Sequence, residues 1–462
     1  MSRILPLGLM ILAVALSGCK ITGNSASASQ ASLRLVHFDA GVGAINLTST
    51  AAGNTPTPSC PCDIQGVSFG GVSNYVNYDS GNSTIYTVAL GDGSATLATD
   101  TFTLSANTDY TLILYGSIGN PGSMLLADTT INTPASGTFE IRPVHVASGS
   151  GSLDFYVIPV PAGTNPSTIN ITNAAPSFSS FSLTGVPLFV QYNAGTYVMF
   201  VTPANSKTIL YESAPVTFNN GDIPTAAIYT TGSGTLVNVD LLYQNNSAGG
   251  STTANTVTPV PNLFSQFKVV NASPNIGSIN VLNTPAGGTT IGAFSNVPFT
   301  GTSSYLLTPA GTNNLEVRAT SNPNSDATAA SENFAGSTDS SVILVGNAPN
   351  VSLIALTDDN LPPSLGDAKL RFVNVSPNAG PIDVQVNFAA VPAASALATN
   401  TASTYVNFVQ NPLPGYTITA NITGTATTAL TLNGVEVVAG GTYTIYIMGN
   451  AGALQGIITR DN

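Results

Sequence analysis

The sequence is poor in charged residues, and above all in cations. Only 7% of its 462 residues are charged, against about 25% in an ordinary soluble domain. Ten residues are Lys or Arg, and the formal net charge is −12. Because binding to phosphates needs clustered cations, this composition excludes nucleic acid as a partner. It also excludes attraction to an anionic membrane surface.

Histidine and the known catalytic motifs are equally scarce. Two histidines, His37 and His145, leave little acid–base machinery near neutral pH. The sequence contains no G-x-S-x-G, H-E-x-x-H, phosphate-loop or dinucleotide-binding motif. We therefore expect a protein that is not an enzyme and that holds no cofactor or metal. The competing class, a secreted hydrolase with carboxylates carried on loops, would need clustered acids, whereas the 22 acidic residues are spread thinly.

Amphipathic helices are missing beyond the N-terminal segment, and the composition favours strands instead. Hydrophobic residues make up 43% of the chain, so there is enough apolar material for packed cores. Short runs of β-forming residues are separated by clusters of Gly, Pro, Asn and Ser. This pattern predicts an all-β protein built of immunoglobulin-like β-sandwiches, with small barrels as the alternative.

One long apolar run, Ile4–Leu16, lies at the N-terminus. It has 13 residues, fewer than the about 20 that a membrane-spanning helix needs, and it suits the core of a signal peptide. Leu16-Ser17-Gly18-Cys19 follows at once and resembles a bacterial lipobox. The resemblance implies a signal peptide over residues 1–18 and acyl chains on Cys19 that anchor the mature chain to a membrane.

Lys20 follows the lipobox cysteine and bears on which membrane holds the protein. In the enterobacterial sorting pattern, Asp at this place retains a lipoprotein at the inner membrane. Lys20 departs from that pattern and favours the outer membrane, with the chain facing either the periplasm or the cell surface. Residues 19–31 are otherwise small and polar, so we interpret them as a flexible tether.

A strand–turn–strand motif occurs four times in the chain. Its third copy reads FKVVNASPNIGSINV, from Phe267 to Val281. The copies align without gaps and follow one another at intervals of 108, 126 and 103 residues. These intervals exceed the about 20–50 residues of solenoid repeats. We therefore expect four tandem domains.

Four positions of the motif are polar or glycine in every copy. The residue at position 0 follows a valine, a cation precedes it by three residues, a glycine follows it by six, and Asn or Asp follows it by nine. The position-0 residues are His37, His145, Asn271 and Asn374; the cations are Arg34, Arg142, Lys268 and Arg371; the glycines are Gly43, Gly151, Gly277 and Gly380; the last residues are Asn46, Asp154, Asn280 and Asp383.

We interpret these repeated positions as structural. If the two arms form a hairpin, positions 0 and +9 lie opposite each other and can hydrogen-bond, which stabilises by about 0.2–1 kcal/mol. If the arms lie in opposite sheets, positions 0 and +9 do not pair, and only the interpretation of the glycine as a turn residue remains. A catalytic role for His37 or His145 is disfavoured because two copies carry Asn, which cannot act as a general base. For the cation we favour a solvated strand residue that discourages edge pairing, with a glycan or partner contact as the alternative.

The domain boundaries follow from the repeats and from Gly- and Pro-rich stretches. We expect sandwiches at residues 32–135, 136–246, 263–360 and 367–462, with linkers at 247–262 and 361–366. The longer linker predicts two pairs of domains with the main hinge near residue 250.

The motif V-[HN]-x-S-P-x4-[IV]-[DN]-V resembles the opening of a bacterial secreted domain-of-unknown-function family, often found in tandem in envelope lipoproteins. The third copy matches with Asn271, Ser273 and Pro274, and the fourth copy matches in the same way. The first two copies depart from it, with Asp39-Ala40 and Ala147-Ser148 where Ser-Pro is usual. The resemblance implies a fold and an envelope location, and it brings no established activity.

Two further polar clusters remain. Cys60 and Cys62 flank a proline in an insert of the first domain. We favour a strained or intermolecular disulfide over free thiols, and rank a metal or redox site last because no nearby His supplies ligands. Asp358-Asp359-Asn360 could hold calcium, but no loop of calcium-binding spacing surrounds it, so a polar interdomain turn is favoured.

The function that these features favour is structural or adhesive. We expect an envelope lipoprotein that acts as a surface spacer, adhesin or binding module for an unknown glycan, protein or matrix ligand. The alternatives are the hydrolase described above and a periplasmic assembly or accessory factor.

Overall fold

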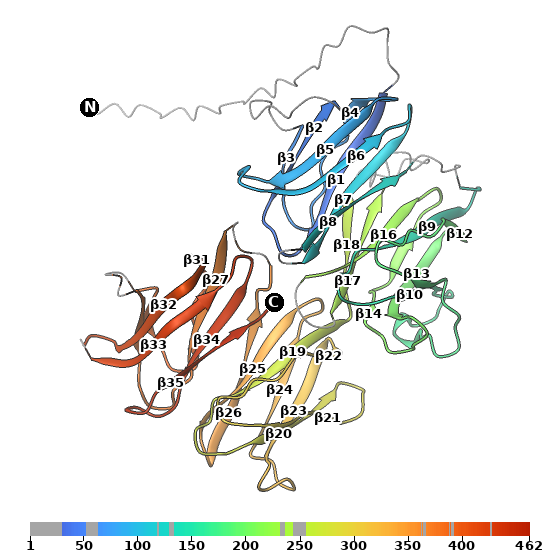
Figure 1. Cartoon of the computed structure of the whole chain (residues 1–462). Helices are drawn as coiled ribbons and strands as arrows, with labels where there is room; N and C mark the ends of the chain where they lie inside the picture. Colours follow the sequence, from blue (N-terminus) through green and yellow to red (C-terminus); the bar gives the residue numbers. More distant parts are fainter. Residues whose placement is uncertain are drawn as a thin grey trace, which may run out of the picture.

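The computed structural model describes residues 30–51, 63–117, 120–128, 134–231, 236–243, 256–361, 363, 366–387, 389, 392–425 and 427–462. These residues form 35 strands and one short 3-10 helix, η1 (Pro166–Thr168), which confirms the all-β prediction. The strands build four sandwiches (Figure 1). Among the described residues, no helix has the length and apolar character needed to span a bilayer.

Domain 1 is a sandwich of two four-stranded sheets. Its strands are β1 (Gln30–Asp39), β2 (Ile45–Ala51), β3 (Ile64–Val67), β4 (Val76–Asp79), β5 (Ser83–Leu90), β6 (Thr96–Thr103), β7 (Asp109–Ser117) and β8 (Asn120–Ala127). One sheet has the order β4-β1-β7-β8 and the other β3-β2-β5-β6. The first strand runs parallel to β7, while its other neighbour, β4, is antiparallel.

Domain 2 repeats this plan with an insert and two more strands. Its strands are β9 (Thr138–His145), β10 (Leu153–Pro159), β11 (Phe178–Phe181), β12 (Val190–Asn193), β13 (Gly195–Pro203), β14 (Tyr211–Glu212), β15 (Val216–Phe218), β16 (Pro224–Thr230), β17 (Val237–Tyr243) and β18 (Val257–Val260). The sheets are β12-β9-β16-β17-β18 and β11-β10-β13-β14, with β15 also paired to β13.

Domains 3 and 4 follow the same order of strands. Domain 3 has β19 (Phe264–Asn271), β20 (Ile279–Pro285), β21 (Ile291–Val297), β22 (Leu306–Pro309), β23 (Gly311–Ala319), β24 (Thr328–Phe334), β25 (Asp339–Asn347) and β26 (Asn350–Asp358). Domain 4 has β27 (Asp367–Asn374), β28 (Ile382–Val386), β29 (Ala394–Leu397), β30 (Thr401–Ala402), β31 (Val406–Val409), β32 (Asn411–Ile422), β33 (Thr428–Val437), β34 (Thr442–Met448) and β35 (Gln455–Arg460).

Each domain has its own hydrophobic core between its two sheets. Strands that face water on one side alternate, as in β20, where Ile279, Val281 and Asn283 are buried and the residues between them are half-buried. The first strand of each domain behaves differently. In β19, every residue after Phe264 is buried, so both faces of this strand are covered.

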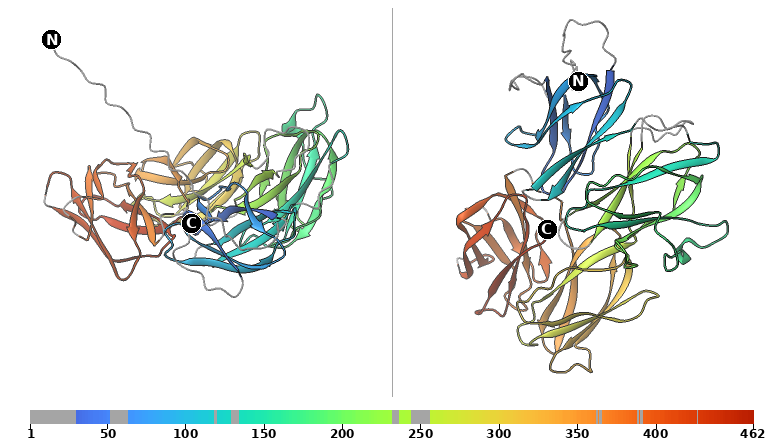
Figure 2. Two further views of the ribbon diagram at one scale, coloured as in Figure 1. Left: turned by 90° about the horizontal axis from the view of Figure 1, so that it is seen from above. Right: turned by 45° about the vertical axis from the view of Figure 1, so that its right-hand side comes forward.

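The second covering layer is the neighbouring domain. One apolar cluster joins Val36 and Phe38 of domain 1 to Val144 and Tyr229 of domain 2, and the rings of Phe38 and Tyr229 stack at 4.5 Å. A corresponding cluster joins domains 3 and 4. The chain therefore forms two face-to-face domain pairs, and the four domains follow a bend instead of a straight rod (Figures 1 and 2).

The junction between the two pairs differs from the expected linker. Residues 257–260, within the stretch 247–262, form strand β18, which pairs with β17 and extends domain 2. The buried Asn262 then holds both domains, because its amide donates to the Val237 carbonyl while its backbone N–H donates to Ser337 of domain 3. The described end of this stretch is therefore a hydrogen-bonded junction.

The hairpin interpretation of the motif is wrong. Position 0 lies at or near the end of the first strand of each domain, and position +9 lies on the second strand, which belongs to the opposite sheet. The motif therefore crosses from one sheet to the other. Three predicted sites, Cys19, Cys60 and Cys62, lie outside the described residues, as do the signal peptide and most of the tether.

Candidate functional sites

The polar residue at position 0 ties the crossing turn of every domain to the first strand. In domain 1, His37 Nε2 lies 2.8 Å from the Gly43 carbonyl, and the backbone N–H two residues on donates to Nδ1 at 3.2 Å. In domain 3, the Asn271 amide donates to the Gly277 carbonyl at 2.8 Å, and its Oδ1 accepts from the backbone N–H two residues on. Domains 2 and 4 make the same two contacts. Histidine and asparagine are therefore interchangeable donors and acceptors here.

These contacts define the protonation state of both histidines. A carbonyl can only accept, so Nε2 carries the hydrogen, and a backbone N–H can only donate, so Nδ1 is bare. The ring is therefore neutral, and burial lowers the pKa of His37 to about 4 and lowers that of His145 as well. Both side chains are fully buried, and each ring nitrogen has a backbone partner, which supports the structural interpretation.

We expect His145→Asn to change the free energy of unfolding by less than about 1 kcal/mol, because Asn can make both backbone contacts. His145→Ala is the matched control, since it leaves a buried N–H and a buried carbonyl without partners and should cost about 2 kcal/mol or more. Thermal or urea unfolding of the full chain measures both. A His145→Asn loss as large as that of the Ala variant would contradict the interchange.

Position +9 fixes a bulge in the adjoining edge strand. Its side-chain oxygen accepts a backbone N–H from a residue with positive φ in β3, β11, β21 or β29. The donor residues are Gly66, Ser180, Asn296 and Ala396, with φ of 68°, 51°, 53° and 47°. Three of the four donors are not glycine, so the hydrogen bond from position +9 helps to hold a conformation that L-residues rarely adopt.

The repeated cation is buried in every domain, so the prediction of a solvated strand residue is wrong. In the interface of domains 3 and 4, Arg371 Nη2 lies 2.5 Å from Asp358 Oδ1 of the neighbouring domain. Its Nη1 also donates to the Thr357 carbonyl at 2.8 Å. The same carboxylate accepts from Ser341 and, at 2.5 Å, from Tyr305. Asp358 therefore belongs to an interdomain ion-pair cluster, which we call a clamp.

In a second clamp of this interface, domain 3 supplies the cation and domain 4 supplies the acid. Lys268 of domain 3 forms a buried ion pair with Asp461 of domain 4. Asp461 Oδ2 accepts from Thr444 at 2.5 Å and from Tyr405 at 3.2 Å. Each domain thus supplies one cation and one acid, as expected for an interface with pseudo-two-fold symmetry.

Domains 1 and 2 are joined by a simpler version of the same arrangement. Arg142 Nη2 lies 3.2 Å from Asp128 Oδ1 of domain 1, and Arg34 Nη1 donates to the Tyr243 carbonyl of domain 2 at 2.8 Å. In the sequence, Gln244 stands where the other three domains have Asp128, Asp358 and Asp461. Among the described residues, the pair of domains 1 and 2 therefore shows the ion-pair clamp Arg142–Asp128, while the other pair of domains shows two such clamps.

An aromatic ring covers each of the four repeated cations. The cation–ring pairs are Arg34 with Tyr75 at 5.0 Å, Arg142 with Phe189 at 4.4 Å, Lys268 with Tyr305 at 4.9 Å and Arg371 with Tyr405 at 4.8 Å. The three tyrosines donate to the clamp acid of their own domain. Domain 2 has Gln in place of that acid, and it also has phenylalanine in place of tyrosine. The hydroxyl is thus present only where it has an acid to bind.

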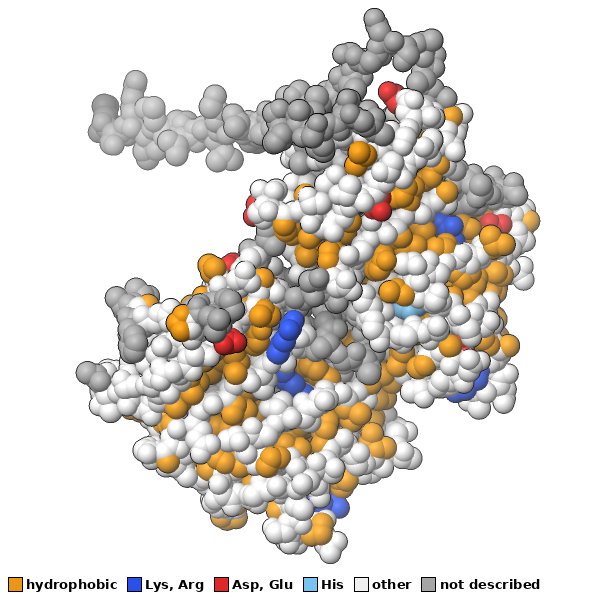
Figure 3. All heavy atoms as spheres, viewed as in Figure 1, with side chains coloured by type: hydrophobic (Ala, Val, Ile, Leu, Met, Phe, Trp, Pro, Cys, Tyr) orange, Lys and Arg blue, Asp and Glu red, His pale blue; other side chains and the backbone are white. Residues whose placement is uncertain are grey.

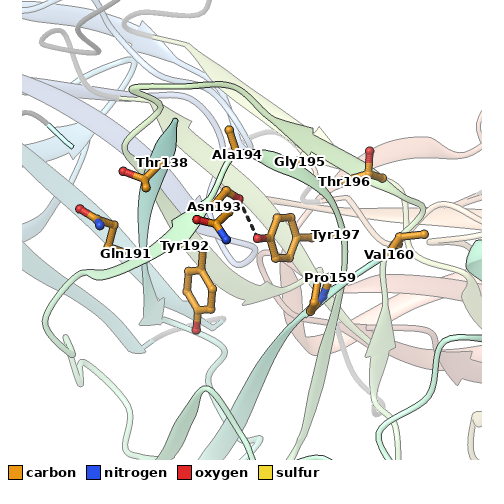
Figure 4. A pocket seen from close by; sticks show the side chains of 10 residues that line it. All are labelled: Thr138, Pro159, Val160, Gln191, Tyr192, Asn193, Ala194, Gly195, Thr196 and Tyr197. Carbon is orange, nitrogen blue, oxygen red and sulfur yellow. Dashed lines mark hydrogen bonds between the residues drawn. The ribbon is translucent and has the colours of Figure 1, made fainter. Parts of the chain in front are cut away.

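A shallow groove of about 570 Å³ lies at one end of domain 2 (Figure 4). It is formed by the turn between β12 and β13, the start of β9 and the end of β10, and Gln191 and Asn193 stand exposed along it. Tyr192 stacks on Phe139 at 5.7 Å, and Tyr197 donates to the Asn193 carbonyl at 2.7 Å. Exposed amides beside tyrosine rings can bind a polyhydroxylated or peptide ligand.

A model of the family described as "Domain of unknown function (DUF4397)" matches residues 31–156 and 265–385. Each matched stretch covers one sandwich and continues into the second strand of the next domain. Each stretch therefore contains both partners of a clamp, Asp128 with Arg142 or Asp358 with Arg371. The comparison with curated proteins gives no match.

Several solved structures match parts of this chain at low similarity. The Bacillus anthracis TIE protein is 8% identical over 88% of this chain and 68% of its own, with a TM-score of 0.16. The fimbrial anchor protein Mfa2 from Porphyromonas gingivalis is 10% identical over 48% and 97%, with a TM-score of 0.22. A family CBM26 module of Eubacterium rectale Amy13K is 11% identical over 45% and 95%, with a TM-score of 0.15.

Proposed function

Since the chain belongs to the DUF4397 family of domains of unknown function, we propose that it is a non-enzymatic envelope lipoprotein. Its four sandwiches form a rigid head that binds a glycan, a protein or matrix material. Acyl chains on Cys19 hold this head at the membrane, and the segment that follows serves as the tether.

The use of the repeated polar side chains supports this proposal most directly. Both ring nitrogens of His37 and of His145 form hydrogen bonds with backbone groups. The charged side chains of the clamps are buried between domains. The repeated positions therefore stabilise the fold and the domain pairs. Binding to an external ligand is left to the surface and to the loops that differ between domains.

The surface suits contact with uncharged polar material. Figure 3 shows a face with many hydrophobic side chains and few charged ones. The groove of domain 2 adds the exposed amides of Gln191 and Asn193 beside Tyr192. The bent arrangement of the four domains makes the chain shorter than a straight rod of four domains would be. We therefore favour a binding head over a simple spacer.

A ligand screen with the full chain tests the binding role. We would probe glycan and protein arrays with the wild type and with a Gln191→Ala, Asn193→Ala double variant. A matched control, Asn314→Ala, removes an exposed amide from the distant domain 3. The proposal expects a ligand that the control still binds and that the groove variant binds at least about tenfold more weakly, a difference of about 1.4 kcal/mol. Equal binding by both variants would exclude the groove, and the lack of any ligand would contradict the binding role.

Anchoring is tested separately through the lipobox. Cys19→Ala removes the only sulfur that the motif can lipidate, so we expect the protein to leave the membrane fraction and appear in the soluble fraction. Cys60→Ala is the control and should remain membrane-bound. Retention of the Cys19→Ala protein would contradict the lipid anchor, and protease treatment of intact cells then distinguishes surface display from a periplasmic location.

A further inference from the structure

Lys268 is the exception among the four repeated cations. The other three domains have arginine at this position, whereas domain 3 has lysine. Its side chain is 3% exposed and its partner Asp461 is fully buried, so water has little access to this ion pair. A primary amine in contact with a carboxyl group can form an amide, and a guanidinium, which stays protonated in proteins, does not react in this way.

The two carboxyl oxygens of Asp461 have different contacts. Oδ2 accepts the hydroxyl protons of Thr444, at 2.5 Å, and Tyr405, at 3.2 Å. Oδ1 contacts Lys268 Nζ and accepts from Thr459 at 3.2 Å. When an amine attacks the carboxyl carbon, one oxygen takes up negative charge, and hydrogen-bond donors that are already in place stabilise it. Oδ2 has such donors, and Oδ1 lies beside the attacking nitrogen.

We propose that Lys268 and Asp461 join in an intramolecular isopeptide bond that links domain 3 covalently to domain 4. The ion pair first passes a proton from Nζ to Oδ1, which gives an amine and a carboxylic acid. Nζ then attacks the Asp461 carboxyl carbon, and the hydroxyls of Thr444 and Tyr405 stabilise the charge on Oδ2. The C–Oδ1 bond breaks, Oδ1 leaves as water with the second Nζ proton, and the N–C bond remains. No oxidant or other reactant is needed.

Burial and contact make this reaction plausible where free lysine and aspartate do not react. Holding two groups in contact replaces a bimolecular encounter, an advantage that reaches about 7–11 kcal/mol in well-oriented cases. Exclusion of water also slows hydrolysis of the product.

The same interface contains a matched pair for comparison. Lys369 Nζ lies 2.9 Å from Asp359 Oδ2, but the Asp359 side chain is 51% exposed. Water therefore reaches this carboxylate, and its other oxygen accepts the Leu361 N–H. We expect no amide between Lys369 and Asp359.

Tryptic peptide mapping of the full chain decides the question. Trypsin does not cleave after an amidated lysine. The linked protein therefore yields residues 208–318 as one uncut peptide joined to Asp461-Asn462, with a total mass lower by one water. Cleavage after Lys369 is the internal control and should be complete. Separate peptides 208–268 and 269–318 from the folded wild type would overturn the proposal.

Two variants test the chemistry. Lys268→Arg keeps the positive charge and introduces the residue that the other three domains have at this position. This variant should have the full mass of its sequence, without the loss of one water, and trypsin should release Asp461-Asn462 as a separate dipeptide. Tyr405→Phe keeps the ring over Arg371 but removes one donor to Oδ2, so the linked fraction should form at least about tenfold more slowly after synthesis, the effect expected for loss of an oxyanion donor. Equal rates for Tyr405→Phe and wild type would overturn the proposed role of Oδ2.

Discussion

Replacing Asp358 by alanine is expected to lower the free energy of unfolding of the domain 3–4 pair by about 3–5 kcal/mol. The substitution leaves the Arg371 guanidinium buried without its carboxylate, and it also removes the acceptor of Ser341 and Tyr305. The cost of an uncompensated buried charge exceeds the value of the lost contact. Calorimetry of the full chain should show the transition of this pair at a lower temperature, while the transition of domains 1 and 2 stays in place.

Two matched variants separate this explanation from a general loss of charge. Asp326→Ala breaks the partly exposed pair with Arg318 on the surface of domain 3 and should cost only about 0–1 kcal/mol. A double replacement, Asp358→Leu with Arg371→Met, removes both buried charges together and should recover most of the loss. If Asp358→Ala costs no more than Asp326→Ala, the clamp contributes little to pairing.

The clamps also show where the sequence stops being informative. The four sandwiches and their starting points follow from a motif whose residues are close together in the chain. The clamp partners lie in different domains, with Lys268 and Asp461 separated by 193 residues. No local pattern shows that an arginine in a strand will be covered by another domain. The available signal was the continuous apolar run of the first strands, such as FKVVN from Phe267, which is typical of burial on both faces.

The motif itself could be interpreted only in part. Its glycine at position +6 correctly indicated a turn. The glycines of the three later copies, Gly151, Gly277 and Gly380, all have positive φ. Whether the two arms pair or cross between sheets depends on which other strands lie beside them, and those strands come from later in each domain. The exchange of His for Asn at position 0 did predict a structural role. Both residues can donate and accept hydrogen bonds, whereas Asn cannot act as a general base.

Asp39→Ser is expected to stabilise domain 1 by about 3 kcal/mol at neutral pH, as follows from a pKa raised by about two units. Asp39 stands in the crossing turn where domains 3 and 4 have Ser273 and Ser376. It is fully buried, its Oδ1 accepts the Gly41 N–H, and burial raises its pKa from 3.8 to about 6. At neutral pH the protein must therefore keep a charged carboxylate in a site that favours the neutral acid.

The geometry shows what the neutral acid gains. In domain 4, the Ser376 hydroxyl donates to the Gly449 carbonyl at 2.7 Å. Asp39 Oδ2 has no hydrogen-bond partner among the described residues and lies beside Gly116, near the end of β7, while Gly449 directly follows the corresponding strand β34. A protonated Oδ2 can donate as the serine does, whereas a carboxylate cannot.

The sign of the pH dependence follows from the raised pKa. The stabilising contribution of Asp39 is fully present below its unfolded value of 3.8 and is lost as the pH rises through about 6. The advantage of Asp39→Ser should therefore be small near pH 4 and grow to its full size above about pH 6. Unfolding of the full chain, followed at several pH values, measures it for the domain 1 transition. Asp92→Ser, in an exposed turn, is the control and should show no such rise. A constant difference between Asp39→Ser and wild type from pH 4 to 7 would contradict a buried acid that titrates in this range.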